Sequence, residues 1–442
     1  MALKELVRIA ARQRALVPLV ARWAARQVRP FGNRDGDART TVLALNAPRY
    51  RADLRMLDAH PDIRIVTLPE AVQDKINALF LARIHPLIAR SATAYFDETN
   101  SAILETRLQL RAYLRAFLPT FCRLAGIDAM TTCTFYYVRD REWEAAAQEV
   151  GIPFIVGHKE NMKDEVIIPE MIRQYRERSY KFHGTQLAVY NAGERRCLVD
   201  GAVARPETIV LTGCPRLDPL LHKRAAGEFA PPRKLVTLFS FRHLVGGMRL
   251  TEARGGFVSA RNHGLVAYFD KTHAAFARAA QRNPDWEFVI KPKWAERWSE
   301  EIEDAIVREL GVGSAAIPNL SISIERPAQQ LIEESAVIAG VNSTSLIEAR
   351  IAGRPVVIPV FEEAAGIHQD RIYFRKYFGT EFLVGETPEH FITQIEAAMR
   401  AERSLVPGDG TALIEEFFGF ADGRATERLA AVFSAAVAGR AA

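Results

Sequence analysis

Four polar side chains stand together at the start of an expected helix, directly after an apolar strand expected at 336–339. They are Asn342, Ser343, Thr344 and Ser345. In open α/β sheets, ligands bind beyond the carboxyl ends of the strands, and the backbone N–H groups at a helix start favour anions. The pattern therefore predicts a phosphate-binding turn formed by Ser343, Thr344 and Ser345.

Glu348 allows a second interpretation of the same turn. Ser345 and Glu348 fit the S/T-x-x-E capping box, in which both side chains bond to backbone N–H groups and no ligand is needed. The box does not account for the polar side chains that precede Ser345. We therefore favour phosphate binding, and we expect Glu348 to reach the ribose hydroxyls of a bound nucleotide.

Basic side chains follow two other expected strands of the same half of the chain. Lys291 and Lys293 flank Pro292 after one strand, and Arg242 follows another. Proline fixes the backbone between the two lysines, and ammonium and guanidinium groups bind phosphate. The alternative is a set of solvated side chains at strand ends. Their placement relative to the hydroxyl-rich turn favours a shared phosphate site.

A proton acceptor is expected from the first half of the chain. His158 and Glu160 come just after an expected strand at 153–156, and Asp97 precedes an expected helix at 101–125. An attacking hydroxyl must lose its proton, which an imidazole or a carboxylate accepts. Two of these candidates also have a structural interpretation. A lone histidine such as His158 is more often structural than catalytic. For Asp97 that alternative is a helix start, capped by Thr99, Asn100 or Ser101.

The candidate site residues must be held in place by the strands and helices around them. Along the chain, short β-branched runs alternate with helical stretches. The alternation predicts βαβ units with parallel sheets, and 442 residues are too many for one core. We expect an α/β protein of two tandem Rossmann-like doubly wound domains, with an N-terminal amphipathic helix and a ligand cleft between the carboxyl ends of the sheets. The expected strands are 41–45, 63–67, 132–138, 153–156, 187–190, 208–211, 235–239, 286–290, 320–322, 336–339 and 355–359. The expected helices are 101–125, 264–282, 299–309, 345–352 and 388–401.

Two stretches rich in glycine, proline or polar residues predict the domain boundaries. They are 31–39 and 225–234. The expected parts are a basic helical segment at 1–30, a first Rossmann-like domain at 40–224, a second one at 233–405 and a helical tail at 411–442.

Positive charge is concentrated in the first 30 residues. The chain has a net charge of +5, whereas this segment holds one acid, Glu5, and a set of basic residues: Lys4, Arg8, Arg12, Arg14, Arg22, Arg26 and Arg29. At helical spacing, Val20, Trp23 and Ala24 lie opposite the arginines, which predicts a helix on an anionic membrane surface. The alternative is a helix packed on its own domain with a solvated basic face. A charge excess confined to one segment argues against a nucleic-acid-binding surface.

The motifs resemble those of GT-B glycosyltransferases of bacterial surface and capsular polysaccharide synthesis, including the CDP-glycerol transferase, sialyltransferase and Kdo-transferase groups. Those families pair a basic "HP" turn with a serine-rich turn. Lys291-Pro292 stands in the first place, with lysine instead of histidine, and Ser343-Thr344-Ser345 stands in the second. The segment Thr212-Gly213-Cys214-Pro215-Arg216-Leu217-Asp218 is similar to their tGxPRxD motif, so the resemblance adds Arg216 to the donor-binding residues.

The resemblance implies a transferase that moves a sugar or polyol unit from a nucleotide-activated donor to a surface polysaccharide or a lipid-linked glycan. It makes 40–224 the acceptor domain and 233–405 the nucleotide-donor domain. No cofactor is expected, because the nucleotide compound is a substrate. No metal is expected either, since Asp35-Gly36-Asp37 mimics a DxD site but lies in a linker. Four widely spaced cysteines fit a reducing compartment. We expect a cytoplasmic protein that is peripheral on the inner membrane.

Two other functions stay open. A nucleotide-sugar 2-epimerase has the same two-domain shape, and an inactive membrane-associated partner in polysaccharide assembly would use the cleft only for binding or not at all.

Overall fold

A computed structural model of the chain describes residues 13–32, 39–88, 92–241, 265–292, 297–366, 369, 372–401 and 405–441. The chain forms two compact units. Unit 1 comprises Met1–Asp218 and Glu416–Ala442, and unit 2 comprises Pro219–Glu415. The predicted residues Lys293 and Arg242, the segment 35–37 and the first 12 residues lie outside the described residues.

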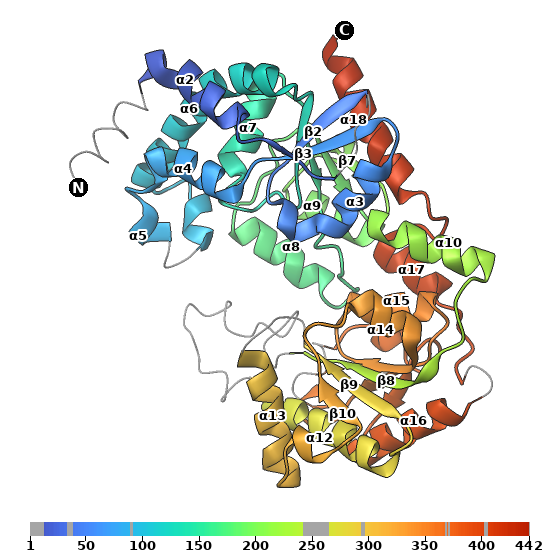
Figure 1. Ribbon diagram of the computed structural model, residues 1–442. Helices are drawn as coiled ribbons and strands as arrows, with labels where there is room; N and C mark the ends of the chain where they lie inside the picture. Colours follow the sequence, from blue (N-terminus) through green and yellow to red (C-terminus); the bar gives the residue numbers. More distant parts are fainter. Residues whose placement is uncertain are drawn as a thin grey trace. The chain divides into compact units, whose positions relative to one another are not determined.

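Unit 1 is built on a seven-stranded sheet with the order β1-β3-β2-β4-β5-β6-β7 (Figure 1). All neighbouring strands pair in parallel except the short β1, which is antiparallel to β3. The strands are β1 (Arg29–Pro30), β2 (Thr40–Ala44), β3 (Ile63–Thr67), β4 (Ala129–Thr132), β5 (Phe154–Gly157), β6 (Gln186–Val189) and β7 (Ile209–Leu211).

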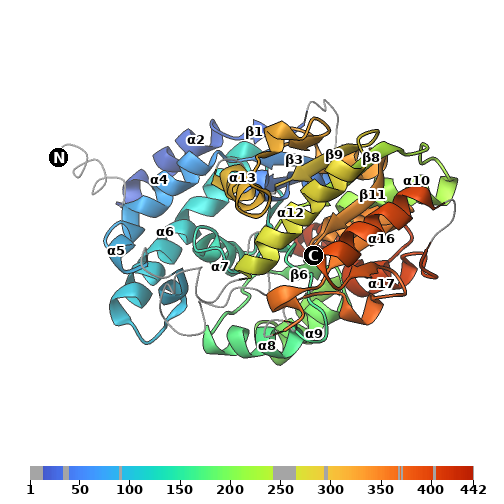
Figure 2. The ribbon, with the colours of Figure 1, turned by 90° about the horizontal axis from the view of Figure 1, so that it is seen from below.

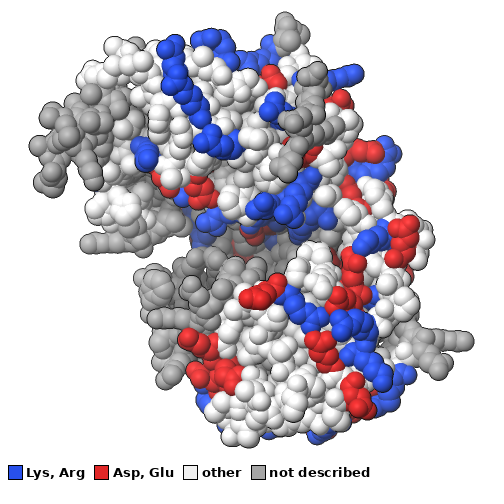
Figure 3. Space-filling view, in the orientation of Figure 1, with Lys and Arg blue, Asp and Glu red and all other residues white. Residues whose placement is uncertain are grey.

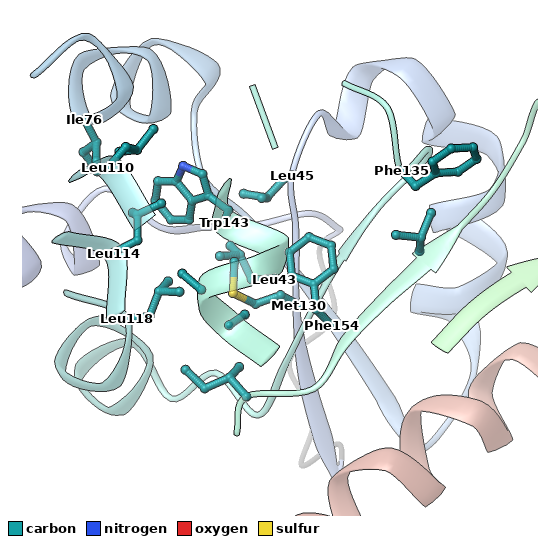
Figure 4. Packing of buried hydrophobic residues seen from close by; sticks show 14 of the residues in the cluster. Leu43, Leu45, Ile76, Leu110, Leu114, Leu118, Met130, Phe135, Trp143 and Phe154 are labelled. Carbon is teal, nitrogen blue, oxygen red and sulfur yellow. The ribbon is translucent and has the colours of Figure 1, made fainter. Parts of the chain in front are cut away.

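Helices of unit 1 cover both faces of this sheet. Consecutive strand residues point to opposite faces, and each face is buried in its own hydrophobic core. Leu43, Met130 and Phe154 belong to the larger core, whereas Val42, Ala129 and Ile155 belong to the smaller one. Figure 4 shows Trp143 in the larger core with Leu114 and Met130 nearby. The helices are α2 (Val17–Ala25), α3 (Arg51–Ala59), α4 (Glu70–Leu81), α5 (His85–Ile88), α6 (Ser101–Ala125), α7 (Arg141–Glu149), α8 (Ile168–Glu177), α9 (Ala192–Asp200) and α18 (Ala425–Ala441).

Unit 2 has a six-stranded parallel sheet with the order β10-β9-β8-β11-β12-β13. Its strands are β8 (Arg233–Phe239), β9 (Glu287–Lys291), β10 (Leu320–Ile322), β11 (Ser335–Gly340), β12 (Val356–Pro359) and β13 (Leu383–Gly385). Its helices are α12 (Val266–Arg282), α13 (Arg297–Leu310), α14 (Ala328–Glu334), α15 (Thr344–Ile351) and α16 (Pro388–Arg400), while α10 (Asp218–Ala226) and α17 (Thr411–Phe418) carry the chain between the units. The predicted α/β class with two doubly wound domains is confirmed.

Most predicted strands lie within a few residues of their expected positions, but the one at 132–138 is wrong. The fourth strand is 129–132, where Ala129, Met130 and Thr131 pair with β2. Beyond Thr132 the chain turns away from the sheet, and Phe135 packs against His158 and Tyr175. The apolar run 133–138 therefore reflects a buried turn. The strands β13 and β1 were not predicted, and β1 lies within the segment 1–30 that was expected to be helical.

The N-terminal helix α2 packs on its own unit. Val17, Ala21 and Ala24 are buried against the larger core, and α2 packs against α6. Figure 2 shows α2 at the edge of unit 1, next to α4 in this view. The prediction for Trp23 is wrong. This residue was expected on the face opposite the arginines, but it is exposed on the same side of the helix as Arg22. Among the described residues, no helix combines the length and the apolar character needed to cross a membrane.

Candidate functional site

The predicted phosphate turn lies where the strand order of unit 2 reverses. After β8 the chain goes on to β9 and β10 on one side and then returns to β11 on the other. The carboxyl ends of β8 and β11 therefore border the crevice in which open α/β sheets bind ligands. The two strands approach closely here, since a Cβ atom on Gly340 would lie 2.9 Å from the carbonyl oxygen of Phe239.

Ser343 is the N-cap of α15, and its Oγ accepts a 3.2 Å hydrogen bond from the backbone N–H of Ser345. The helix begins at Thr344 with Ser343 as its N-cap, two residues earlier than a capping box of Ser345 and Glu348 requires, so that interpretation is wrong. Asn342 has a structural role, because its Oδ1 accepts from the backbone N–H of Tyr373 at 2.8 Å. Thr344 and Ser345 are partly exposed at the helix start.

Glu348 and Lys291 both contact protein groups in this conformation. Glu348 is buried on α15, and its Oε2 lies 3.3 Å from Nε2 of Gln329 on α14. Lys291 ends β9 and donates its ammonium group to the carbonyl oxygen of Ile324, on the β10 side of the sheet. Partial burial lowers the pKa of Lys291. Contact of either residue with a nucleotide stays a prediction. To bind phosphate, Lys291 would have to give up its hydrogen bond to the Ile324 carbonyl oxygen.

His158 is completely buried in unit 1, directly after β5. Its Nε2 lies 3.3 Å from Oε1 of Glu194, and the rings of Phe135 and Tyr136 lie beside the imidazole. Glu194 also accepts from Lys163 Nζ and, at 3.1 Å, from the Tyr175 hydroxyl. Burial opposes the negative charge of Glu194, but Lys163 and His158 outweigh it and lower its pKa to about 2. The imidazole would reach a substrate only if the covering rings moved.

The two carboxylate candidates of unit 1 both reach solvent. Glu160 follows β5 with its side chain about half exposed, and its Oε1 lies 3.6 Å from Lys159 Nζ. Asp97 Oδ1 accepts from both the hydroxyl and the backbone N–H of Thr99, and these bonds lower the pKa of Asp97. Asn100 caps the long helix α6, as the structural alternative predicted.

Arg216 takes part in a cluster that sequence reasoning missed. Its Nη1 donates to the Tyr190 hydroxyl at 3.0 Å and lies 3.6 Å from Asp53 Oδ2, while its backbone N–H donates to Asp53 Oδ1. A cavity of about 20 Å³, beside Tyr50, adjoins the cluster near the ends of β4, β5 and β6. Asp53 lies within α3 and not directly after a strand, and no local pattern of the sequence links it to Arg216.

Among the described residues, no group of three or more histidine, cysteine, aspartate or glutamate side chains is placed to hold a metal ion.

No protein-family model matches the chain, and no curated protein matches it. Solved structures do match over most of its length. The wall teichoic acid polymerase TagF is similar over 99% of this chain and 97% of its own, with 11% identity and a TM-score of 0.50. A protein from Listeria monocytogenes assigned as a UDP-N-acetylglucosamine 2-epimerase covers 90% of this chain and 96% of its own, with 12% identity and a TM-score of 0.50.

The UDP-GlcNAc 2-epimerase from Neisseria meningitidis is similar at 12% identity and a TM-score of 0.49, over 90% of this chain and 99% of its own. At these identities the likeness concerns the fold. The chain therefore has the fold of two Rossmann-like domains that GT-B enzymes share.

Proposed function

We propose that this chain is a transferase that moves a sugar or polyol-phosphate unit from a nucleotide-activated donor to a surface polysaccharide or a lipid-linked glycan. The observation that carries the proposal is the polar turn 342–345, which lies at the strand-order reversal of unit 2 and opens α15. A helix start with partly exposed hydroxyls offers donors for phosphate oxygens at a place where such sheets bind ligands.

The fold likeness to TagF supports a transferase acting on a cell-envelope polymer, because TagF is a wall teichoic acid polymerase. In the proposed reaction an acceptor hydroxyl loses its proton, attacks the donor, and releases a nucleotide with additional negative charge. The turn of Ser343, Thr344 and Ser345 stabilises that charge. Lys291 contributes once it has left the carbonyl of Ile324, and Lys293 and Arg242 are further proposed cations. Glu348 is the proposed partner of the ribose, and we also assign Arg216 to the donor site.

Glu160 is the proposed proton acceptor of unit 1. It is about half exposed directly after β5, whereas His158 is buried. Asp97 is the weaker candidate, because the two hydrogen bonds from Thr99 stabilise its carboxylate and lower its pKa, which makes it a poorer base.

The substitution Ser343→Asp separates phosphate binding from helix capping. Aspartate caps helices as well as serine does, so the melting temperature without ligand should stay near that of the wild type. Its negative charge would repel phosphate at the helix start, so we expect affinity for the nucleotide to fall at least ~10-fold, as for ~1.4 kcal/mol. Binding is measured by thermal shift and calorimetry with CMP, CDP, UDP, ADP and GDP.

Thr387→Asp is the matched control for this experiment. Thr387 caps α16 by accepting from the backbone N–H of His390 at 3.0 Å, and α16 follows the edge strand β13 rather than the strand-order reversal. The control should bind nucleotide like the wild type. Wild-type affinity in Ser343→Asp, or no stabilisation of the wild type by any of the five nucleotides, would overturn the phosphate site.

The fold likeness to the Listeria monocytogenes protein favours a nucleotide-sugar 2-epimerase as the second candidate. The two functions differ in their need for an acceptor. Conversion of UDP-GlcNAc to its 2-epimer without any acceptor would establish the epimerase, whereas nucleotide release that depends on a glycan or lipid-linked acceptor would establish the transferase.

A further inference from the structure

The exposed face of α2 carries an unusual combination of apolar and basic side chains. Leu19 is 59% exposed and Trp23 is 39% exposed. Arg22 and Arg26 are exposed beside them at the i, i+3, i+4 and i+7 spacing of one helix face. We refer to Leu19, Arg22, Trp23 and Arg26 as the α2 stripe. Burial of the other face on unit 1 leaves the stripe as the side that a partner can reach.

Further positive charge surrounds the stripe. The Nζ atom of Lys75, on the neighbouring helix α4, lies 6.0 Å from the centre of the Trp23 ring. Arg29 follows on β1, is exposed, and donates to the carbonyl oxygen of Arg26 at 3.2 Å. Helix α2 itself contains no acidic residue. Figure 3 shows Lys and Arg side chains over the region where Figure 1 places α2.

We propose that the α2 stripe docks unit 1 on a membrane surface that contains anionic lipids. Tryptophan is favoured at the boundary between headgroups and acyl chains, because its ring is apolar with one polar N–H. Leu19 would enter the same layer, and the surrounding cations complement the negative charge of the lipids. Because α2 is packed on α6, docking through the stripe holds unit 1 in one orientation on the membrane.

The test measures binding of the full chain to equimolar phosphatidylglycerol and phosphatidylcholine vesicles, with pure phosphatidylcholine vesicles as the neutral comparison. The double variant Arg22→Ala with Arg26→Ala should bind anionic vesicles roughly 30-fold more weakly, as follows for two cations at about 1 kcal/mol each. Leu19→Ala with Trp23→Ala should weaken binding roughly 10-fold or more through lost apolar contact. All variants should keep the circular dichroism and thermal unfolding of the wild type.

The control removes two exposed arginines elsewhere in unit 1, Arg205 and Arg424, by substitution to alanine. This variant should bind vesicles like the wild type. Wild-type binding by both stripe variants would overturn the proposal, as would equal binding to neutral and anionic vesicles, or a loss of the same size in the control. No donor or acceptor is present in this assay, so its outcome is independent of the proposed transferase activity.

Discussion

Glu194 keeps its negative charge in the core of unit 1 because three neighbours compensate for the loss of water. Lys163, Tyr175 and His158 surround its carboxylate, and the pKa of Glu194 falls to about 2 despite burial. The ordinary pKa of glutamate is about 4.3. The charged pair therefore stabilises the fold fully above about pH 4.3, and this stabilisation is lost as the pH falls toward 2.

Glu194→Gln should lower the free energy of unfolding by about 3–5 kcal/mol at pH 7, because it leaves the buried charge of Lys163 without its partner. The loss relative to the wild type should be smaller at pH 3. Urea unfolding at both pH values measures it. Glu105→Gln, an exposed glutamate on α6, should change little at either pH. An equal loss at pH 7 and pH 3 would show that the carboxylate charge is not responsible.

Single residues show what the sequence can and cannot predict about the site. The turn of Ser343, Thr344 and Ser345 was predictable, because its hydroxyls are consecutive and directly follow a buried strand. The contact between Asp53 and Arg216 joins residues 163 positions apart, and no local pattern records it. The sequence does not show where the Lys291 side chain points either, because it bonds to the carbonyl oxygen of Ile324, which follows the next strand, β10.

Elements with clear end signals were predicted best. Helix α6 runs over Ser101–Ala125 as expected, because Asn100 caps its start and Gly126 adopts the left-handed conformation that ends it. The fourth strand was misplaced because apolar content alone does not distinguish a buried turn from a strand.

Close packing of β8 against β11 fixes the start of the polar turn. Gly340→Ala would place a Cβ 2.9 Å from the carbonyl oxygen of Phe239 and 3.1 Å from Leu346 Cδ2. The strand ends would have to separate, so we expect a loss of about 1–3 kcal/mol in unfolding free energy and weaker nucleotide binding. Urea unfolding and calorimetry measure the two effects.

Gly366→Ala is the control for this substitution, because its nearest contact would be an ordinary 3.5 Å to the carbonyl oxygen of Glu362. If Gly340→Ala had the stability of the wild type, the close approach would not constrain the turn.

At the scale of the whole molecule, the chain leaves unit 1 after Asp218 and returns to it at Glu416. The returning helix α18 contributes Leu429 and Phe433 to the smaller core of unit 1. Asp218 fixes this return, because its two carboxylate oxygens accept from the backbone N–H groups of Ala425 and Thr426 at 3.1 and 2.7 Å. The Asp of the tGxPRxD-like motif thus caps the helix that completes unit 1.

Asp218→Ala should therefore destabilise unit 1 and leave unit 2 unchanged. The substitution removes one buried and one partly buried hydrogen bond to a carboxylate, for which we expect a loss of about 1–3 kcal/mol in the free energy of unfolding. Hydrogen exchange followed by mass spectrometry should show faster exchange in α18 and in the strands that border Leu429, whereas β8 and β11 should exchange as in the wild type. Asp200→Ala is the control, since this exposed aspartate pairs with Arg196 on α9, away from α18. Faster exchange across unit 2 in Asp218→Ala would contradict this prediction, because it would show that the two units lose stability together.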